Sequence, residues 1–188
     1  FISWRNNLNN FSPIDGMIIA NEFFDVIPTE RFEFSNEKFS KLFITTLSNQ
    51  LKYKWVEDNT LISLFKQSCN NHEINLPNKY RSEINENYND WIKKIGSSLI
   101  KGIVILIDYG YHAREYYLDD RNRGTLVCVN NHSSNFDPLN NIGNQDISAF
   151  VNFSHISNLA SEYNLKTLGY LSQASLLINL GILDLYNK

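Results

Sequence analysis

The sequence predicts an α/β protein built around a parallel sheet, and three observations support this prediction. Two short runs, Gly16–Ala20 and Ile103–Ile107, are continuously apolar, as expected of strands that are buried on both faces under helices. The segment Ile84–Leu99 has apolar residues at helical spacing, and it leads directly into the second run. A helix that feeds a buried strand is half of a βαβ unit, so we expect a Rossmann-like sheet.

A different pattern between the two runs indicates an inserted antiparallel β segment. From Arg31 to Val56 aromatic residues lie among polar ones, and residues 51–55 alternate strictly between apolar and polar. Turns are expected near Ser35-Asn36 and Ser48-Asn49. We therefore assign residues 1–30 and 58–188 to the α/β core and residues 31–57 to a β insertion. This insertion either receives a protein substrate, forms a homodimer, or contributes ordinary core.

Periodicity, capping residues and turn residues predict the remaining elements. In chain order we expect a helix over Asp58–Gln67, a loop over Asn70–Asn78, closure of the Ile84–Leu99 helix by Gly102 at C′, a loop over Tyr111–Gly143 interrupted by a strand at Thr125–Val129, a helix from a Ser154 cap to Tyr163, a strand over Leu165–Leu171, and a helix over Ser172–Leu180 that ends at Gly181.

Composition narrows the classes of function. The chain is 43% hydrophobic and 13% aromatic, which is typical of a globular protein. Its net charge is −3 and no stripe of lysine and arginine stands out, so a large nucleic-acid footprint is excluded. No apolar run is long enough for a membrane span, and we expect no signal peptide. The two cysteines and four histidines show no metal-ligand spacing, so we expect no metal site and a reducing compartment.

The loop after the first apolar run carries candidate site residues. In open α/β sheets, ligands bind at the carboxyl ends of the strands. The segment Asn21–Asp25 offers two carboxylates, Glu22 and Asp25, together with the amide of Asn21. Two carboxylates suit a guanidinium or an amine, because they accept its N–H donors. The alternative is that one of the two carboxylates caps the start of a helix.

The loop after the second run begins with Asp108-Tyr109. An aspartate at the end of an apolar strand is well placed for a site, although it could instead satisfy the amides of a neighbouring loop. Glu83, ahead of the Trp91 helix, is a further candidate. His132 could line a site from its loop, whereas we expect His155 to lie on the surface of a helix.

Several blocks of the sequence match one family in order and in spacing. They are Gly16–Pro28 (the family's G-x-I-x-A-N-E-F-F-D-A-L-P), Ile107–Tyr111 (I-D-Y-G-Y), Arg123–Leu126 (R-G-T-L), His132 with Asp137–Leu139, Gly143–Ala149 (G-x-Q-D-I-T-A), and Gly169-Tyr170 with Gln173-Ala174 and Leu180–Ile182. Together they resemble the MidA family of S-adenosylmethionine-dependent class I methyltransferases. That family includes the mitochondrial arginine methyltransferase that assists assembly of respiratory complex I.

The resemblance implies a function and a set of roles. It implies an S-adenosylmethionine-dependent protein methyltransferase that acts on an arginine of a complex I subunit or a similar protein. In that enzyme Glu22 and Asp25 would be catalytic, and Asn21, Asp108 and Tyr109 would lie toward the cofactor. We assign Glu83, His132, Gln145 and Asp146 to substrate binding. The two apolar runs would be the fourth and fifth strands of a class I methyltransferase sheet, here partial.

Two features set this sequence apart from the family pattern. The family has T-A-H-V-D-F where Phe150 and Asn152 replace the histidine and the aspartate, so any role of those two groups is in doubt here. The family's glycine-rich cofactor loop precedes the first run, and its last strand follows Lys188. Since the chain also opens Phe1-Ile2-Ser3-Trp4 without methionine, we expect a part of a longer protein that alone binds S-adenosylmethionine poorly.

Two other functions stay open at this point. A nucleobase amino-methyltransferase is one, because an asparagine followed by aromatics loosely resembles an N-P-P-Y loop, although both prolines are missing. A non-catalytic assembly factor with the same fold is the other. The style of the R-G-T-L and D-P-L blocks favours a bacterial protein, and hence the cytoplasm; a eukaryotic one would lie in the mitochondrial matrix.

Overall fold

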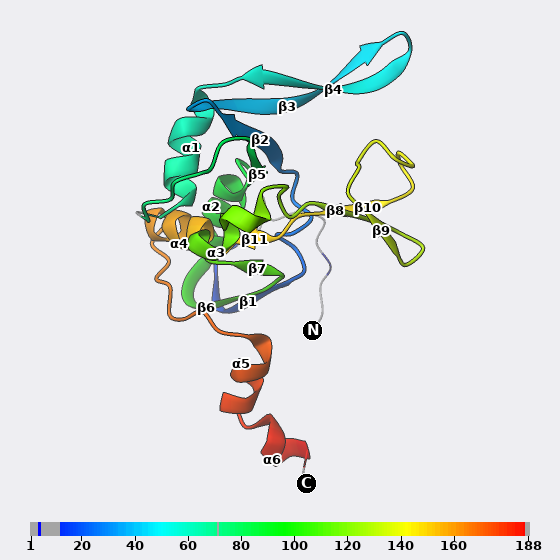
Figure 1. The fold of residues 1–188 in the computed structure, drawn as a ribbon. Helices are drawn as coiled ribbons and strands as arrows, with labels where there is room; N and C mark the ends of the chain where they lie inside the picture. The colour runs from blue at the N-terminus through cyan, green and yellow to red at the C-terminus, as the bar shows by residue number, and fades with distance from the viewer. Residues whose placement is uncertain (1–3, 5–11, 71, 187–188) are drawn as a thin grey trace.

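The computed structural model describes Trp4 and residues 12–70 and 72–186. A parallel pair of strands, β1 (Ile14–Asn21) and β6 (Leu99–Ile107), lies at the lower side of the body in Figure 1, and helix α2 (Tyr88–Ser97) directly precedes β6. Both predicted parallel strands are present and lie side by side, so the predicted α/β fold is confirmed. The opening Phe1–Ser3 segment lies outside the described residues.

Only one face of this strand pair is covered by described residues. Ile18 and Leu106 pack against α2 and against helix α4 (Phe153–Glu162). Met17 and Ile19, which point to the other face, are 53% and 61% exposed. The prediction that the strands are buried on both faces is therefore wrong for the described chain. Successive side chains of a strand point to opposite faces, and here helices pack against one of them.

Gly102 lies within β6, opposite Gly16 of β1, so its predicted role at the end of a helix is wrong. A Cβ at position 102 would overlap the carbonyl oxygen of Gly16, and its φ is +152°. The glycine therefore permits close approach of the two strands. Helix α2 ends earlier, at Ser97, and it also begins later than predicted because Tyr80–Ile84 form strand β5.

A four-stranded antiparallel sheet occupies the predicted insertion and adds β5. Its order is β4-β3-β2-β5, with β2 at Glu30–Ser35, β3 at Lys38–Leu47 and β4 at Gln50–Glu57. Two-residue turns at Asn36-Glu37 and Ser48-Asn49 have positive φ at both residues, which matches the twist of hairpin strands. The hairpin β3–β4 extends well beyond the rest of the molecule (Figure 1).

The main aromatic core lies between this sheet and two helices, α1 (Thr60–Ser68) and α3 (Ala113–Tyr116). Its buried members come from five segments of the chain: Phe32, Phe39, Leu61, Phe65, Cys69, Tyr80, Ile84, Ala113, Tyr116 and Tyr117. The predicted helix over residues 58–67 is confirmed as α1, and the predicted loop that follows it is confirmed except at Asn71, which lies outside the described residues.

The rest of the described chain forms short elements. They are β7 (Gly110–Tyr111), the 3₁₀ turn η1 (Asp119–Arg121), β8 (Val127–Asn130), β9 (Ser133–Asn135), β10 (Asp146–Ser148), β11 (Val151–Asn152), α5 (Gln173–Asn179) and α6 (Ile182–Tyr186). Strands β8, β9 and β10 form an arm that projects to one side, and α5 and α6 extend away from the body (Figure 1). The predicted strand near residues 125–129 is confirmed as β8.

The segment from Leu165 to Leu171 is not a strand, contrary to the prediction. It runs past the end of α4, where Leu165 N–H bonds the Ala160 carbonyl at 2.9 Å, and the Tyr170 hydroxyl bonds the Gly110 carbonyl at 3.3 Å. Four of its seven residues are Leu or Tyr, as in a buried strand, but no described strand pairs with it. The next predicted helix is present as α5, capped by the Ser172 side chain. Within the described chain, none of the helices has the length and hydropathy needed to span a bilayer.

Candidate functional site

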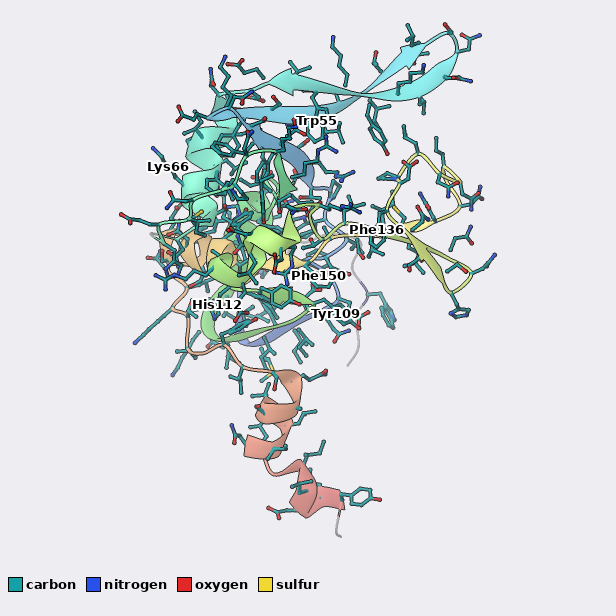
Figure 2. The ribbon with its side chains drawn as sticks, viewed as in Figure 1. Trp55, Lys66, Tyr109, His112, Phe136 and Phe150 are labelled. Atoms are coloured by element: carbon teal, nitrogen blue, oxygen red, sulfur yellow. The ribbon has the colours of Figure 1, made fainter. Side chains whose placement is uncertain are left out.

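The loops that follow β1 and β6 meet at one edge of the parallel pair. Asn21 lies opposite Ile107, and the Glu22 N–H extends the ladder by donating to the Ile107 carbonyl at 2.8 Å. Asp108-Tyr109 follow at once on β6; Tyr109 is labelled in Figure 2. The structure thus brings Asn21, Glu22, Asp25, Asp108 and Tyr109 together, as the strand-end rule leads one to expect.

Asp108 holds the shape of this edge. One carboxylate oxygen accepts the N–H groups of Phe23, Phe24 and Asp25 at 3.2, 2.9 and 3.2 Å. The other accepts the N–H of Tyr109 at 2.9 Å. Burial raises the pKa of Asp108, and the four N–H donors partly offset that rise. Asp108 therefore satisfies the amides of the neighbouring loop, which is the structural alternative considered for it.

Glu22 is held in an unusual backbone conformation with an exposed side chain. Its φ is +47°, in the left-handed region, which is unfavourable for a residue with a Cβ. Its carboxylate lies 3.5 Å from the Tyr109 hydroxyl. No helix starts at residues 22–29, so neither Glu22 nor Asp25 is a helix cap. Backbone strain of this kind occurs most often at functional sites, so it makes Glu22 a candidate site residue.

Asp25 is the second carboxylate of this loop, and it is partly buried. Its Oδ1 is buried and has no hydrogen-bond partner among the described residues. Burial raises the pKa of Asp25, and the charges of Asp108 and then Glu22 raise it further. Its backbone carbonyl accepts the Ala149 N–H at 2.9 Å, so the loop is fixed from a second side. An unsatisfied acceptor of this kind is suited to a ligand that carries N–H donors.

Aromatic side chains of α2 hold the same loop in place, and these contacts are not predicted from the sequence. Phe24 is buried against the Tyr88 ring at 5.5 Å, and Phe23 lies edge-on to Trp91 at 4.7 Å. Both partners come from α2. The two phenylalanines at successive positions were the available signal, because they precede a turn yet are too apolar to be left in solvent.

Glu83 lies in β5 with its side chain fully buried, and it does not face the β1/β6 edge. One oxygen accepts the backbone N–H and the hydroxyl of Thr125, at 2.7 and 3.1 Å. The other lies 3.7 Å from the guanidinium of Arg31. Burial is the main cause that raises the pKa of Glu83. In the structure this residue ties β2, β5 and the Arg123–Thr125 loop together.

Gly124 is required by this arrangement, and its replacement tests it. A Cβ at position 124, where φ is +83°, would overlap the Glu83 carboxylate. We expect Gly124→Ala to lower the free energy of unfolding by about 2 kcal/mol. Gly143→Ala is the control, since φ there is +80° but no atom lies within 4 Å of the added Cβ. This variant should lose only about 1 kcal/mol, the cost of placing an alanine at a positive φ. Equal losses in urea unfolding would contradict the overlap.

The other three residues assigned to substrate binding lie on the arm β8–β10. His132 is at the tip of the arm, in the turn between β8 and β9. Gln145 bonds the Asn135 side chain and the carbonyls of Asp137 and Pro138, so its amide holds the arm. Asp146 is exposed on β10, three residues before Ala149, which bonds the site loop. Their role in substrate binding stays a prediction.

His155 is buried, and the prediction that it lies on the surface is wrong. It is 2% exposed and packs 5.7 Å from the Tyr88 ring. The helix is capped by Asn152, whose side chain accepts the His155 N–H, and not by Ser154. Position 155 therefore lies in the first turn of α4, on the face that packs against α2. Its Nε2 has no partner among the described residues, and burial lowers the pKa of His155 to about 4.

His155 therefore makes stability depend on pH in a defined window. Its pKa is 6.5 when unperturbed and about 4 in the fold, so the unfolded chain binds the proton first. The contribution of neutral His155 is complete above pH 6.5 and is lost as the pH falls toward 4. We expect His155→Phe to fold within about 1 kcal/mol of wild type at pH 7.5 and to show a shallower loss between pH 6.5 and 4. An equal fall in the free energy of unfolding of both proteins between pH 6.5 and 4, measured with urea, would contradict this.

The described residues offer no group of three or more histidine, cysteine, aspartate or glutamate side chains that could hold a metal. Both cysteines are free and buried, and burial raises the pKa of the Cys69 thiol to about 11. The chemistry of the edge is therefore that of its carboxylates, its tyrosine hydroxyl and the amide of Asn21.

Comparison with known proteins gives one family and two similar structures. A family model matches residues 1–171. A crystal structure from Burkholderia thailandensis, described as a "likely methyl transferase" bound to S-adenosyl-homocysteine, is similar with a TM-score of 0.86 and 26% identity, over 97% of this chain and 46% of that chain. A second crystal structure, of an uncharacterized protein from the same organism, is similar with a TM-score of 0.83 and 26% identity. The match covers 93% of this chain and 46% of that chain.

The chain thus spans just under half the length of both solved relatives. A search of curated proteins gave no match. Because the family model covers most of the sequence, its assignment applies to the chain as a whole. The chain belongs to the family described as "Putative S-adenosyl-L-methionine-dependent methyltransferase".

Proposed function

We propose that this protein is an S-adenosylmethionine-dependent methyltransferase that modifies an arginine of a protein substrate. The observation that carries the proposal is the pair of carboxylates Glu22 and Asp25 in the loop after β1, since one oxygen of Asp25 is buried and has no hydrogen-bond partner among the described residues. A guanidinium has five N–H donors in a planar fork and suits two convergent carboxylates. In this proposal residues 31–57 form an insertion on the methyltransferase core.

The residues of this edge fit a cationic cofactor as well as a cationic substrate. Glu22, Asp25 and Asp108 place three carboxylates within one pair of loops. Burial and then the charges of Asp108 and Glu22 raise the pKa of Asp25, and burial raises the pKa of Asp108. Asn21, at the last position of β1, would lie toward the cofactor's methionine end. Asp108 and Tyr109 would form the opposite wall. S-adenosylmethionine supplies, when bound, a methyl group on a sulfonium that leaves as a neutral thioether.

The protein's own contribution is to orient and activate the guanidinium. Arginine has a pKa above about 12, so its nitrogens are poor nucleophiles. Carboxylates that accept N–H bonds localise the positive charge on two nitrogens and leave the third more nucleophilic. They would also orient that nitrogen toward the methyl group of a bound cofactor. As the nitrogen took the methyl group from the sulfonium, the Asp25 carboxylate would accept the proton that the nitrogen loses.

Resemblance of the sequence to the MidA family supports a subunit of respiratory complex I as the target. The full-length protein, incubated with labelled S-adenosylmethionine and such a subunit, should place label on arginine. The same subunit with its arginines replaced by lysine should remain unlabelled. Label on a nucleobase, or no transfer at all, would contradict the proposal; the second result would favour a non-catalytic assembly factor.

A further inference from the structure

A cationic groove lies at the start of β5, away from the β1/β6 edge. It has a volume of about 450 Å³ and is lined by Glu33, Ser35, Lys79, Arg81, Asn122 and Arg123. Its walls come from β2, from β5 with the turn before it, and from the loop after η1. A hollow of this size can receive two or three side chains of an extended peptide.

The frame of the groove is fixed by hydrogen bonds. Arg81 N–H donates to the Asn122 carbonyl at 3.2 Å, and a backbone bridge joins Arg81 to Arg123. The Asn78 side chain accepts the Ser35 hydroxyl at 3.0 Å and the Asn36 N–H at 2.8 Å. Both sides of the hollow are therefore tied to the antiparallel sheet, and its shape is set before a ligand arrives.

Arg81 is held in place within this frame. Its Nε donates to the Glu33 carboxylate at 2.6 Å, and its guanidinium lies 5.1 Å from the ring centroid of Trp55. Trp55 is labelled in Figure 2 on the hairpin β3–β4. Stacking on an aromatic ring leaves the remaining N–H groups of an arginine free to bind an anion. Arg81 therefore satisfies the one carboxylate of the groove and still presents donors.

The other two cations of the groove are uncompensated. Lys79 and Arg123 are exposed, and neither makes an ion pair with any described residue. Three cations thus face one carboxylate, in a chain whose net charge is −3. A local excess of positive charge on an acidic protein favours a local anionic group over an extended polyanion such as nucleic acid.

We propose that this groove binds an acidic segment of the protein substrate, an inference that rests on the proposed function. Carboxylates match the lysine and arginine donors that line it. The groove is joined to the site loop through β5, because Asn85, just after that strand, bonds the Ile27 carbonyl at 3.1 Å. Arg81 precedes Asn85 by four residues, about 13 Å of extended chain. An acidic residue a few positions from the target arginine would reach it.

Peptide binding tests the groove without any need for methyl transfer. The probe is a fluorescein-labelled peptide, Gly-Asp-Glu-Asp-Glu-Gly, titrated with full-length protein and followed by fluorescence anisotropy. We expect Lys79→Gln with Arg123→Gln to raise its Kd about tenfold, since each exposed ionic contact contributes modestly. Replacing the peptide acids by Asn and Gln should weaken binding of the wild type to a similar extent, and added salt should weaken it too.

A matched double variant controls for net charge. Lys66→Gln with Lys93→Gln removes two exposed cations from α1 and α2, and Lys66 is labelled in Figure 2. It should leave the Kd within about twofold of wild type, because its charges are screened from the groove. Equal weakening by both double variants would overturn the proposal, as would equal binding of the acidic and amide peptides.

The same variants separate this inference from the proposed function. Acidic-peptide binding that depends on Lys79 and Arg123, without label transfer to arginine, would retain the groove and refute the methyltransferase proposal. Label transfer to a subunit with unchanged KM in the Lys79/Arg123 variant would do the reverse. If both proposals hold, the variant raises KM for an acidic substrate about tenfold while kcat changes little.

Discussion

Replacing Glu22 by glutamine is expected to lower the rate of methyl transfer to arginine by about 100-fold or more. The carboxylate lies just after β1, beside the Tyr109 hydroxyl and in the same loop as the Asp25 oxygen that has no partner among the described residues. An amide keeps the size of the side chain but offers an N–H₂ to a guanidinium that has only donors. Loss of one such electrostatic contact costs about 3 kcal/mol in the barrier. Initial rates with labelled S-adenosylmethionine measure it.

Two comparisons show whether this loss is chemical. Asp15→Asn removes an exposed carboxylate at the other end of the same strand and should leave the rate within about twofold of wild type. Glu22→Gly should lose as much activity as glutamine yet unfold at no lower urea concentration, because glycine accepts the φ of +47° without strain. A Glu22→Gln enzyme with near wild-type rates would show that the carboxylate has no catalytic role.

The sequence alone was enough to place the parallel strands and the loops that follow them. Both strands consist of consecutive apolar residues next to glycine, a pattern that tertiary context seldom overrides. Since parallel strands end at one edge, their last residues had to meet, and Asn21 does lie opposite Ile107. Glu22, Asp25 and Asp108 follow these two strand ends, so they were expected to lie close together. Secondary-structure pattern therefore predicts the position of this edge.

Strand β5 could not be predicted in the same way. Its sequence, Tyr-Arg-Ser-Glu-Ile, places serine and glutamate at buried positions, so no apolar alternation is visible. Glu83 is tolerated there because Thr125 and Arg31, both distant in the chain, satisfy it. The predicted helix therefore begins at Ile84, the last residue of β5, and the rest of the strand is not predicted. Buried polar residues conceal a strand whenever their partners are far away in sequence.

The burial of His155 on a helix could not be predicted from local sequence either. Asn152, two residues before Ser154, caps α4, and the packing of α4 against α2 places His155 in the core. Nothing local distinguishes the two caps, since both residue types are good acceptors at this position. Likewise, the free oxygen of Asp25 depends on burial by the surrounding fold and not on neighbouring residues. Exposure of single polar groups is a tertiary property.

Replacing Asp108 by asparagine is expected to lower the free energy of unfolding by about 3 kcal/mol and to release the site loop. The aspartate accepts three loop N–H groups on one oxygen and the Tyr109 N–H on the other. Asparagine has one acceptor oxygen, so its N–H₂ must face an N–H donor in either orientation. Bonds to a charged acceptor contribute about 1.5–3 kcal/mol each, and an opposed donor adds a desolvation cost. Urea unfolding measures the loss.

The release of the loop distinguishes this effect from a general loss of stability. Amide hydrogen exchange at Phe23, Phe24 and Asp25 should accelerate in Asp108→Asn more than exchange in the aromatic core, because those amides lose their acceptor directly. Asp120→Asn, at an exposed position in η1, should change neither measurement. Unaltered protection of the three amides would mean that Asp108 does not hold the loop. The positions of Glu22 and Asp25 would then depend on the aromatic contacts with α2 alone. In that case Phe24→Ala would be the variant that displaces the two carboxylates.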